Sequence, residues 1–119
     1  MIHAALASTR DYIKTRPDNV RRFLQAYLEG MKIARTESEF AKQVIGKYTK
    51  TTDTADLENS YQTFLAAWEK LPLVPPAAVQ TMLNFATHPT AKSAKPEAFI
   101  DNSILSEIGK SGFVDRLYK

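Results

Sequence analysis

The sequence contains no cysteine and only four glycines, two histidines and one tryptophan among its 119 residues. Without cysteine, the chain has no disulfide framework, no thiol nucleophile and no thiolate ligand for a metal. The glycines are scattered at positions 30, 46, 109 and 112, so they form no glycine-rich phosphate-binding loop. No apolar run approaches the roughly 18–20 residues that a membrane-spanning helix requires. These absences remove several of the commonest kinds of site from consideration.

A secretory leader is not recognisable at the start of the chain. Residues 1–7 are apolar but contain no Lys or Arg, and Arg10 and Asp11 follow too soon for the apolar core of a leader. As written, the chain is therefore expected to remain in the cytoplasm. Its length fits a single domain, residues 1–119, with a modest core of its own.

The chain has no recognisable catalytic or metal-binding constellation. His3 and His88 lie far apart, and neither belongs to a zinc-binding motif. Glu37 and Glu39 are two residues apart, which directs them to different faces of a helix. We therefore expect that the chain is not an enzyme and that it uses no metal or other cofactor.

The net charge of +3 is unevenly distributed, because residues 1–35 carry +4 and residues 36–119 carry −1. A basic end of this kind occurs in nucleic-acid-binding proteins. The residues that would contact a nucleic acid are Arg10, Lys14, Arg16, Arg21 and Arg22. However, no helix-turn-helix signature accompanies them, and Arg21 and Arg22 are spaced for pairing with Asp18 on one helix. We expect a solvated helix face and no nucleic-acid partner.

The longest apolar stripe predicts a helix that begins at Pro17 and reaches about Arg35. A short helical turn, capped by Ser8 or Thr9, is expected before it. Gly30 lies inside the long helix, where glycine costs about 1 kcal/mol relative to alanine, and therefore predicts a close packing contact. The stripe consists of Val20, Phe23, Leu24, Tyr27, Leu28 and Met31.

Four further apolar stripes predict four more helices. Asp101 or Asn102 caps the last of them, residues 91–98 are expected to form an exposed loop, and the apolar tail 113–118 is expected to dock on the helices. Since no period-two alternation is sustained, we predict a mainly α fold of about five to six amphipathic helices, with a candidate short strand at residues 1–7. The four stripes lie at residues 40–48, 57–68, 76–86 and 104–108.

The aromatic residues fall mostly at positions where a helix faces its core. Packing in that core is the favoured interpretation, and a ligand-binding aromatic cage is the alternative. The residues concerned are Tyr27, Tyr48, Tyr61, Phe64 and Trp68.

Four segments, taken in order, resemble the C-terminal part of one protein family. They are ALASTRDYIKTRPDNVRRFLQAYLEG, KQVIGKYTKT with its following acidic cap, LVPPAAVQTMLNF and KPEAFIDNSILSEIGKSGFVDRLY. Their order and spacing are similar to those in the periplasmic solute-binding proteins of ABC importers for nitrate, sulfonate, taurine and thiamine-precursor type ligands. The resemblance extends from Ala4 to Tyr118, which is nearly the whole chain.

This resemblance implies a type II periplasmic-binding fold, in which two α/β lobes joined by a hinge hold the ligand between them. Residues 1–7 would be a hinge strand, and residues 8–119 a helical region that packs back onto the lobes. Ser8, Thr9 and Arg10 would be nearest to a bound anion, because they open a helix directly after the strand. The alternative is that Ser8 or Thr9 only caps the helix and Arg10 faces water.

The resemblance further implies a role in which a full-length periplasmic protein binds a small molecule and delivers it to an ABC permease. Most ligand contacts would then come from segments that precede Met1, and the present chain would correspond to a C-terminal fragment or a truncated homologue. Helix faces without their sheet are expected to associate, which predicts a homodimer of the isolated chain. A free-standing α-helical protein-interaction or regulatory module is the alternative, since its basic first third could attract an acidic partner.

Overall fold

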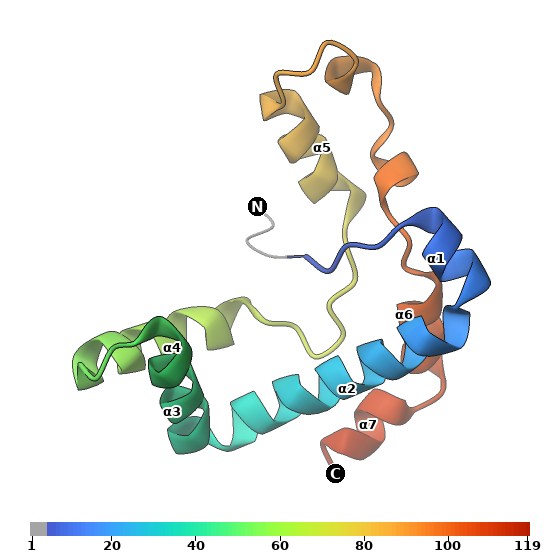
Figure 1. Ribbon diagram of the computed structural model, residues 1–119. Coiled ribbons are helices and arrows are strands. Elements are labelled where there is room, and N and C mark those ends of the chain that lie inside the picture. The colour runs from blue at the N-terminus through green and yellow to red at the C-terminus, as the bar shows by residue number, and fades with distance from the viewer. Residues whose placement is uncertain (1–4) are drawn as a thin grey trace.

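The computed structural model describes residues 5–119, which form seven α-helices and two short 3₁₀-helices and contain no strand (Figure 1). The predicted mainly α fold is therefore confirmed. Residues 5–7 of the candidate strand have no regular secondary structure, and its first four residues lie outside the described part. None of the helices in residues 5–119 combines the length and the apolar character needed to cross a bilayer.

The chain begins with a short helix and a long one, as the proline and the apolar stripe predict. Helix α1 (Arg10–Thr15) is capped by Thr9, whose Oγ1 accepts a hydrogen bond from the backbone N–H of Tyr12 at 3.1 Å. Helix α2 (Pro17–Thr36) starts at Pro17, where the missing N–H of proline costs no helical hydrogen bond. It is the longest helix of the fold and contacts α1, α3, α6 and α7.

Helices α3 (Ser38–Thr49) and α4 (Thr54–Ala67) pack against each other as a pair. Asp53 caps α4 by accepting hydrogen bonds from the N–H groups of Ala55 and Asp56, both at 2.9 Å. Lys42 of α3 bridges the two helices, since its Nζ lies 2.8 Å from Glu58 Oε2 of α4. The pair extends from α2 as one arm of the molecule (Figure 1).

A second arm contains α5 (Pro76–Phe85) and the segment that follows it (Figure 1). The exposed loop predicted for residues 91–98 is wrong in part, because this segment contains the 3₁₀-helices η1 (Ala91–Ser93) and η2 (Pro96–Phe99), and Ala91 is buried. Tight i→i+3 hydrogen bonds stabilise such turns without an apolar stripe. The bond from Ala98 N to Lys95 O, at 3.0 Å, is one of them.

The core lies where α2 meets the C-terminal helices α6 (Ser103–Lys110) and α7 (Phe113–Leu117). Leu28 and Ile108 are each 1% exposed and form its centre. Gly112, with φ of 76°, makes the turn that lets α7 fold back. The predicted docking of the tail is confirmed, and the tail is itself helical. The buried core residues are Leu28, Ile104, Leu105, Ile108 and Val114.

Two local predictions about α2 are wrong. Arg21 pairs with Glu107 of α6 instead of with Asp18, because the docking of α6 brings that carboxylate alongside. Gly30 makes no close packing contact, since nothing lies within 4 Å of where its Cβ would be. By contrast, a Cβ on Gly109 would lie 2.6 Å from Leu71 Cδ2, so the tight contact occurs at another glycine.

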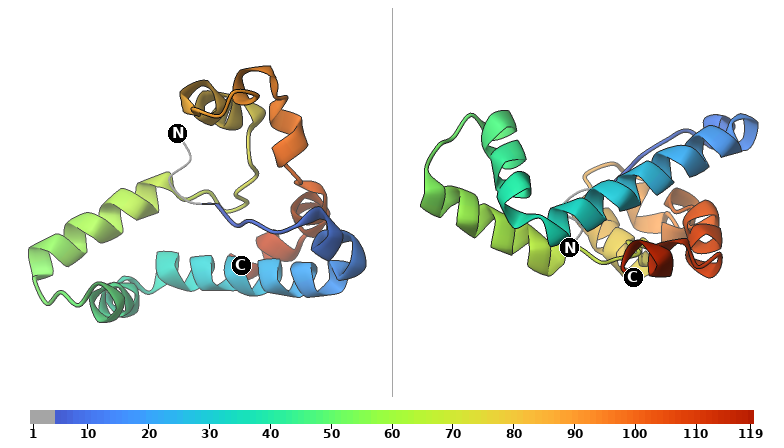
Figure 2. Two further views of the ribbon diagram at one scale, coloured as in Figure 1. Left: turned by 45° about the horizontal axis from the view of Figure 1, so that its top comes forward. Right: turned by 90° about the horizontal axis from the view of Figure 1, so that it is seen from below.

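The core occupies only part of the molecule. The Cα radius of gyration is 16.7 Å, whereas a compact chain of this length has about 14 Å. The two arms extend away from the core in Figure 1 and in the left-hand view of Figure 2. Several large apolar side chains on α2 and on the arms are consequently exposed.

Candidate functional site

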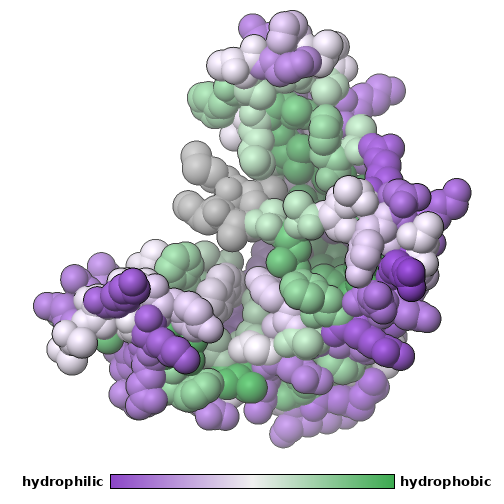
Figure 3. Space-filling view, in the orientation of Figure 1, coloured by the Kyte–Doolittle hydropathy of each residue, from purple (hydrophilic) through white to green (hydrophobic). Residues whose placement is uncertain are grey.

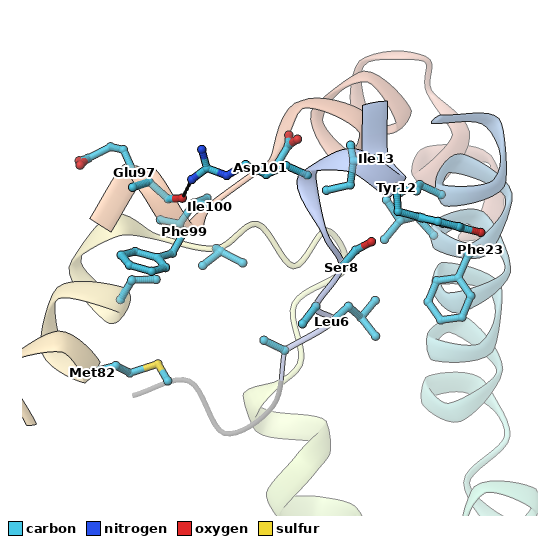
Figure 4. A pocket seen from close by; sticks show the side chains of 18 of the residues that line it. Leu6, Ser8, Tyr12, Ile13, Phe23, Met82, Glu97, Phe99, Ile100 and Asp101 are labelled. Atoms are coloured by element: carbon cyan, nitrogen blue, oxygen red, sulfur yellow. Dashed lines mark hydrogen bonds between the residues drawn. The ribbon is translucent and has the colours of Figure 1, made fainter. Parts of the chain in front are cut away.

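A hollow of about 1270 Å³ lies between the start of the chain and the second arm (Figure 4). We call it the N-terminal hollow. Its walls come from residues 5–8, α1, the first half of α2, α5 and residues 97–101. Segments from both ends of the sequence therefore face one another across it.

The walls of the N-terminal hollow are mainly apolar. Leu6, Phe23, Met82 and Phe99 contribute large side chains that are each more than half exposed. Figure 3 shows apolar surface that continues from α5 towards the concave middle of the molecule. Polar side chains also line it, and they are Ser8, Arg10, Tyr12, Asn19, Glu97 and Asp101.

The three predicted ligand-contacting residues separate into two groups. Ser8 and Arg10 line the N-terminal hollow, whereas Thr9 is the N-cap of α1. The Arg10 guanidinium donates a hydrogen bond through Nη2 to the backbone carbonyl of Ala98 in η2. Arg10 therefore connects the start of α1 to the second arm, across a sequence separation of 88 residues. This non-local bond could not be foreseen from the spacing of residues.

Two neighbouring residues at the start of α6 make different contacts. Asn102 is the N-cap residue of α6 but makes no side-chain cap bond, whereas the Asp101 carboxylate before it accepts hydrogen bonds from the hydroxyl and the backbone N–H of Ser103. Asn102 instead holds the segment before α5: its Nδ2 donates to Val74 O, and its Oδ1 accepts from Val74 N, both at 3.0 Å. The two Asn102 bonds therefore attach the segment before α5 to the start of α6.

The hydrogen bonds from the Ser103 hydroxyl, and then from its N–H, lower the pKa of Asp101 below its ordinary value of 3.8. The carboxylate therefore stabilises the folded state at pH values above 3.8, and this contribution is lost as the pH falls through the lower pKa of the folded protein. We expect Asp101→Asn to lower the free energy of unfolding modestly at neutral pH and to flatten its decline in acid. Urea denaturation over a series of pH values measures both effects.

The control for this experiment is Asp115→Asn, which removes an exposed carboxylate of α7 but leaves the bonds of Ser103 in place. An acid decline that is equally steep in wild type and Asp101→Asn would contradict the assignment.

A second hollow, the α2–α4 groove, lies where α2, α3 and α4 meet. It has a volume of about 300 Å³. The rings of Phe64 and Trp68 stack at its edge, with centroids 5.9 Å apart. The Tyr61 hydroxyl donates to Ala34 O at 2.9 Å. The lining residues are Gly30, Ile33, Ala34, Phe40, Ala41, Val44, Ile45, Tyr61, Phe64 and Trp68.

The predicted core packing of the aromatic residues is wrong for most of them. Only Tyr61 is buried, Trp68 is half-buried, and Tyr27, Tyr48 and Phe64 are exposed. Helical spacing places side chains on one face but does not say whether another element covers that face. The α2–α4 groove was missed for this reason.

Within residues 5–119, no three His, Asp or Glu side chains are grouped so as to hold a metal ion. His88 is on the surface, where its Nδ1 lies 2.9 Å from Thr90 Oγ1. Of the basic residues considered for nucleic-acid binding, Arg10 and Arg21 contact the carbonyl of Ala98 and the carboxylate of Glu107.

Comparison of the chain with models of protein families, with curated proteins and with solved structures finds no match. A functional assignment therefore depends on the geometry of the N-terminal hollow and the α2–α4 groove.

Proposed function

We propose that this chain is the C-terminal helical part of the solute-binding component of an ABC importer, with a non-catalytic role. The observation that supports this most directly is the N-terminal hollow, whose apolar walls face each other with no layer between them. Helices of a stable domain bury their apolar faces against another layer of structure. In the proposed protein, the sheet of an α/β lobe supplies that layer.

The energetics favour such a layer. Burial of one large apolar side chain contributes about 1.5–3 kcal/mol. Phe23 of α2 and Phe99 of η2 are 58% and 65% exposed, and both line the hollow. A sheet seated between α2 and α5 would cover both rings and join the second arm to the core. The helices then brace the lobe while other segments supply most ligand contacts.

Ser8 and Arg10 are the residues of this chain that we propose to lie closest to a bound anion. They occupy the wall of the hollow beside the first described residues. Arg10 supplies the positive charge, and its bond to Ala98 holds the side chain in place. Thr9 contributes indirectly by capping α1. In the full-length protein we propose a periplasmic location and an ABC permease as partner.

Calorimetric titration and the coding DNA test this proposal together. We expect the 119-residue chain to give no heat with nitrate, taurine or an aminopyrimidine, because half a binding cleft lacks convergent donors. We also expect the reading frame upstream of Met1 to continue through an α/β lobe, and the protein that includes this lobe to bind one of these probes. A stop codon directly before Met1, or micromolar binding by the 119-residue chain, would contradict the proposal.

A free-standing interaction or regulatory module is the second candidate. Complete burial of all helix stripes within the chain would favour it. The exposed rings of Phe23 and Phe99 count against it, whereas the α2–α4 groove is a surface that such a module could use.

A further inference from the structure

We propose that two copies of this chain associate through the α2–α4 groove. The groove lies at the far end of α2 from the N-terminal hollow and involves different residues, apart from sharing that helix. The proposal concerns the 119 residues alone and does not depend on the importer assignment.

The exposed area of the chain is large enough for such an interface. Its accessible surface is 8954 Å². A compact monomer of 13.4 kDa exposes about 6500 Å², so the excess is about 2500 Å². A standard interface buries about 800 Å² on each partner. The excess is spread over both arms and the N-terminal hollow as well as the α2–α4 groove, and about a third of it would match what one copy contributes to a stable dimer.

The chemistry of the groove favours an apolar protein surface over a small polar ligand. Every lining residue is uncharged. The hydroxyl of Tyr61 already donates to Ala34 O and so is not free to donate to a ligand. Ligand pockets normally contain a few polar groups that fix the orientation of the bound molecule. A bare apolar patch with exposed rings is instead typical of a protein contact.

The same patch contains both a projection and a recess. Phe40 of α3 projects and is 53% exposed. Gly30 of α2 forms a recess, because the space where its Cβ would lie is open to 4 Å. A two-fold interface joins the same surface on both copies, so that surface must be complementary to itself. A copy related by a two-fold axis can place Phe40 against the Gly30 recess of its partner.

The charged side chains that bridge α3 and α4 are paired with one another. Lys42 Nζ lies 2.6 Å from Glu39 Oε1 and 2.8 Å from Glu58 Oε2, which leaves a net charge of −1 on these three side chains. Along α2, the apolar surface continues from Ile33 past Gly30 to Tyr27, which is also exposed. A second copy that packs here would therefore contact a stripe of α2 that has no charged side chain at the centre of the stripe.

The mass in solution tests the proposal. Light scattering during size-exclusion chromatography is expected to give twice 13.4 kDa for the unsubstituted chain. Phe40→Glu should shift the mass to 13.4 kDa and weaken association about tenfold or more, because it places a charge in the apolar contact. The matched control is Phe85→Glu, since Phe85 is 80% exposed on α5 and lines neither hollow. This control should remain dimeric.

Gly30→Arg provides a second variant whose fold is not at risk. Arginine is a better helix former than glycine, and the site has room for a side chain. We expect unchanged circular dichroism and a monomeric mass. A monomeric unsubstituted chain, a mass above two copies, or dimers that survive both Phe40→Glu and Gly30→Arg would each overturn the proposal. None of these measurements depends on the presence of an upstream lobe or on ligand binding.

Discussion

Replacement of Leu28 by alanine is expected to lower the free energy of unfolding by about 3 kcal/mol, because truncation of a buried leucine removes its transfer energy and leaves a cavity. Leu28 is 1% exposed and lies in the only buried cluster that joins α2 to α6 and α7 within the described residues. Small domains have a total stability of about 5–15 kcal/mol. The substitution therefore removes a large share of it, which urea denaturation followed by circular dichroism measures.

Phe85→Ala is the control for this measurement. It removes a larger side chain, but Phe85 is 80% exposed, so the change in stability should stay within about 0.5 kcal/mol. Equal losses for the two variants would show that the region around Leu28 does not carry the stability of the chain. All samples need the same protein concentration, because association also stabilises the folded state.

Replacement of Asn102 by aspartate is expected to cost about 2 kcal/mol at neutral pH. The shape of the side chain is kept, but the donor to Val74 O is lost, and a carboxylate oxygen then faces that carbonyl oxygen. The acceptor for Val74 N remains. Acid should relieve the loss, because the protonated carboxyl group can again donate to the carbonyl. Denaturation at neutral and acidic pH measures the difference from wild type.

Asn59→Asp is the matched control, since Asn59 is exposed on α4 and the same chemical change there leaves the Val74 contacts intact. A loss at Asn102 that does not shrink in acid would indicate a packing defect and contradict the hydrogen-bonding role.

Local chemistry made the helix boundaries predictable. Pro17 and Pro76 each open a helix, and Thr9 and Asp53 cap one, as their residue types indicate. The turn at Gly112 was predictable from its tolerance of positive φ. These features depend on residues within a few positions of one another. The sequence pattern therefore contained the longer α-helices, but not η1, η2 or the helix α7.

The tertiary contacts were not predictable in the same way. The partner of Arg21 is 86 residues away, and that of Arg10 is 88 residues away. The exposure of Tyr48 and Phe64 depends on which helix faces receive a neighbour. A helical stripe indicates an apolar face but does not identify what covers it. For the candidate sites, the sequence predicted Ser8 and Arg10, which line the N-terminal hollow. It did not predict the α2–α4 groove.

The composition of the core has a consequence for synthesis of the chain. Ile108 and Val114 are made more than 75 residues after Leu28, although the three side chains share one core. The α3–α4 pair can form while translation continues, because its contacts are local. The core can close only after α6 and α7 have emerged from the ribosome, so the apolar face of α2 stays uncovered while the intervening residues are made.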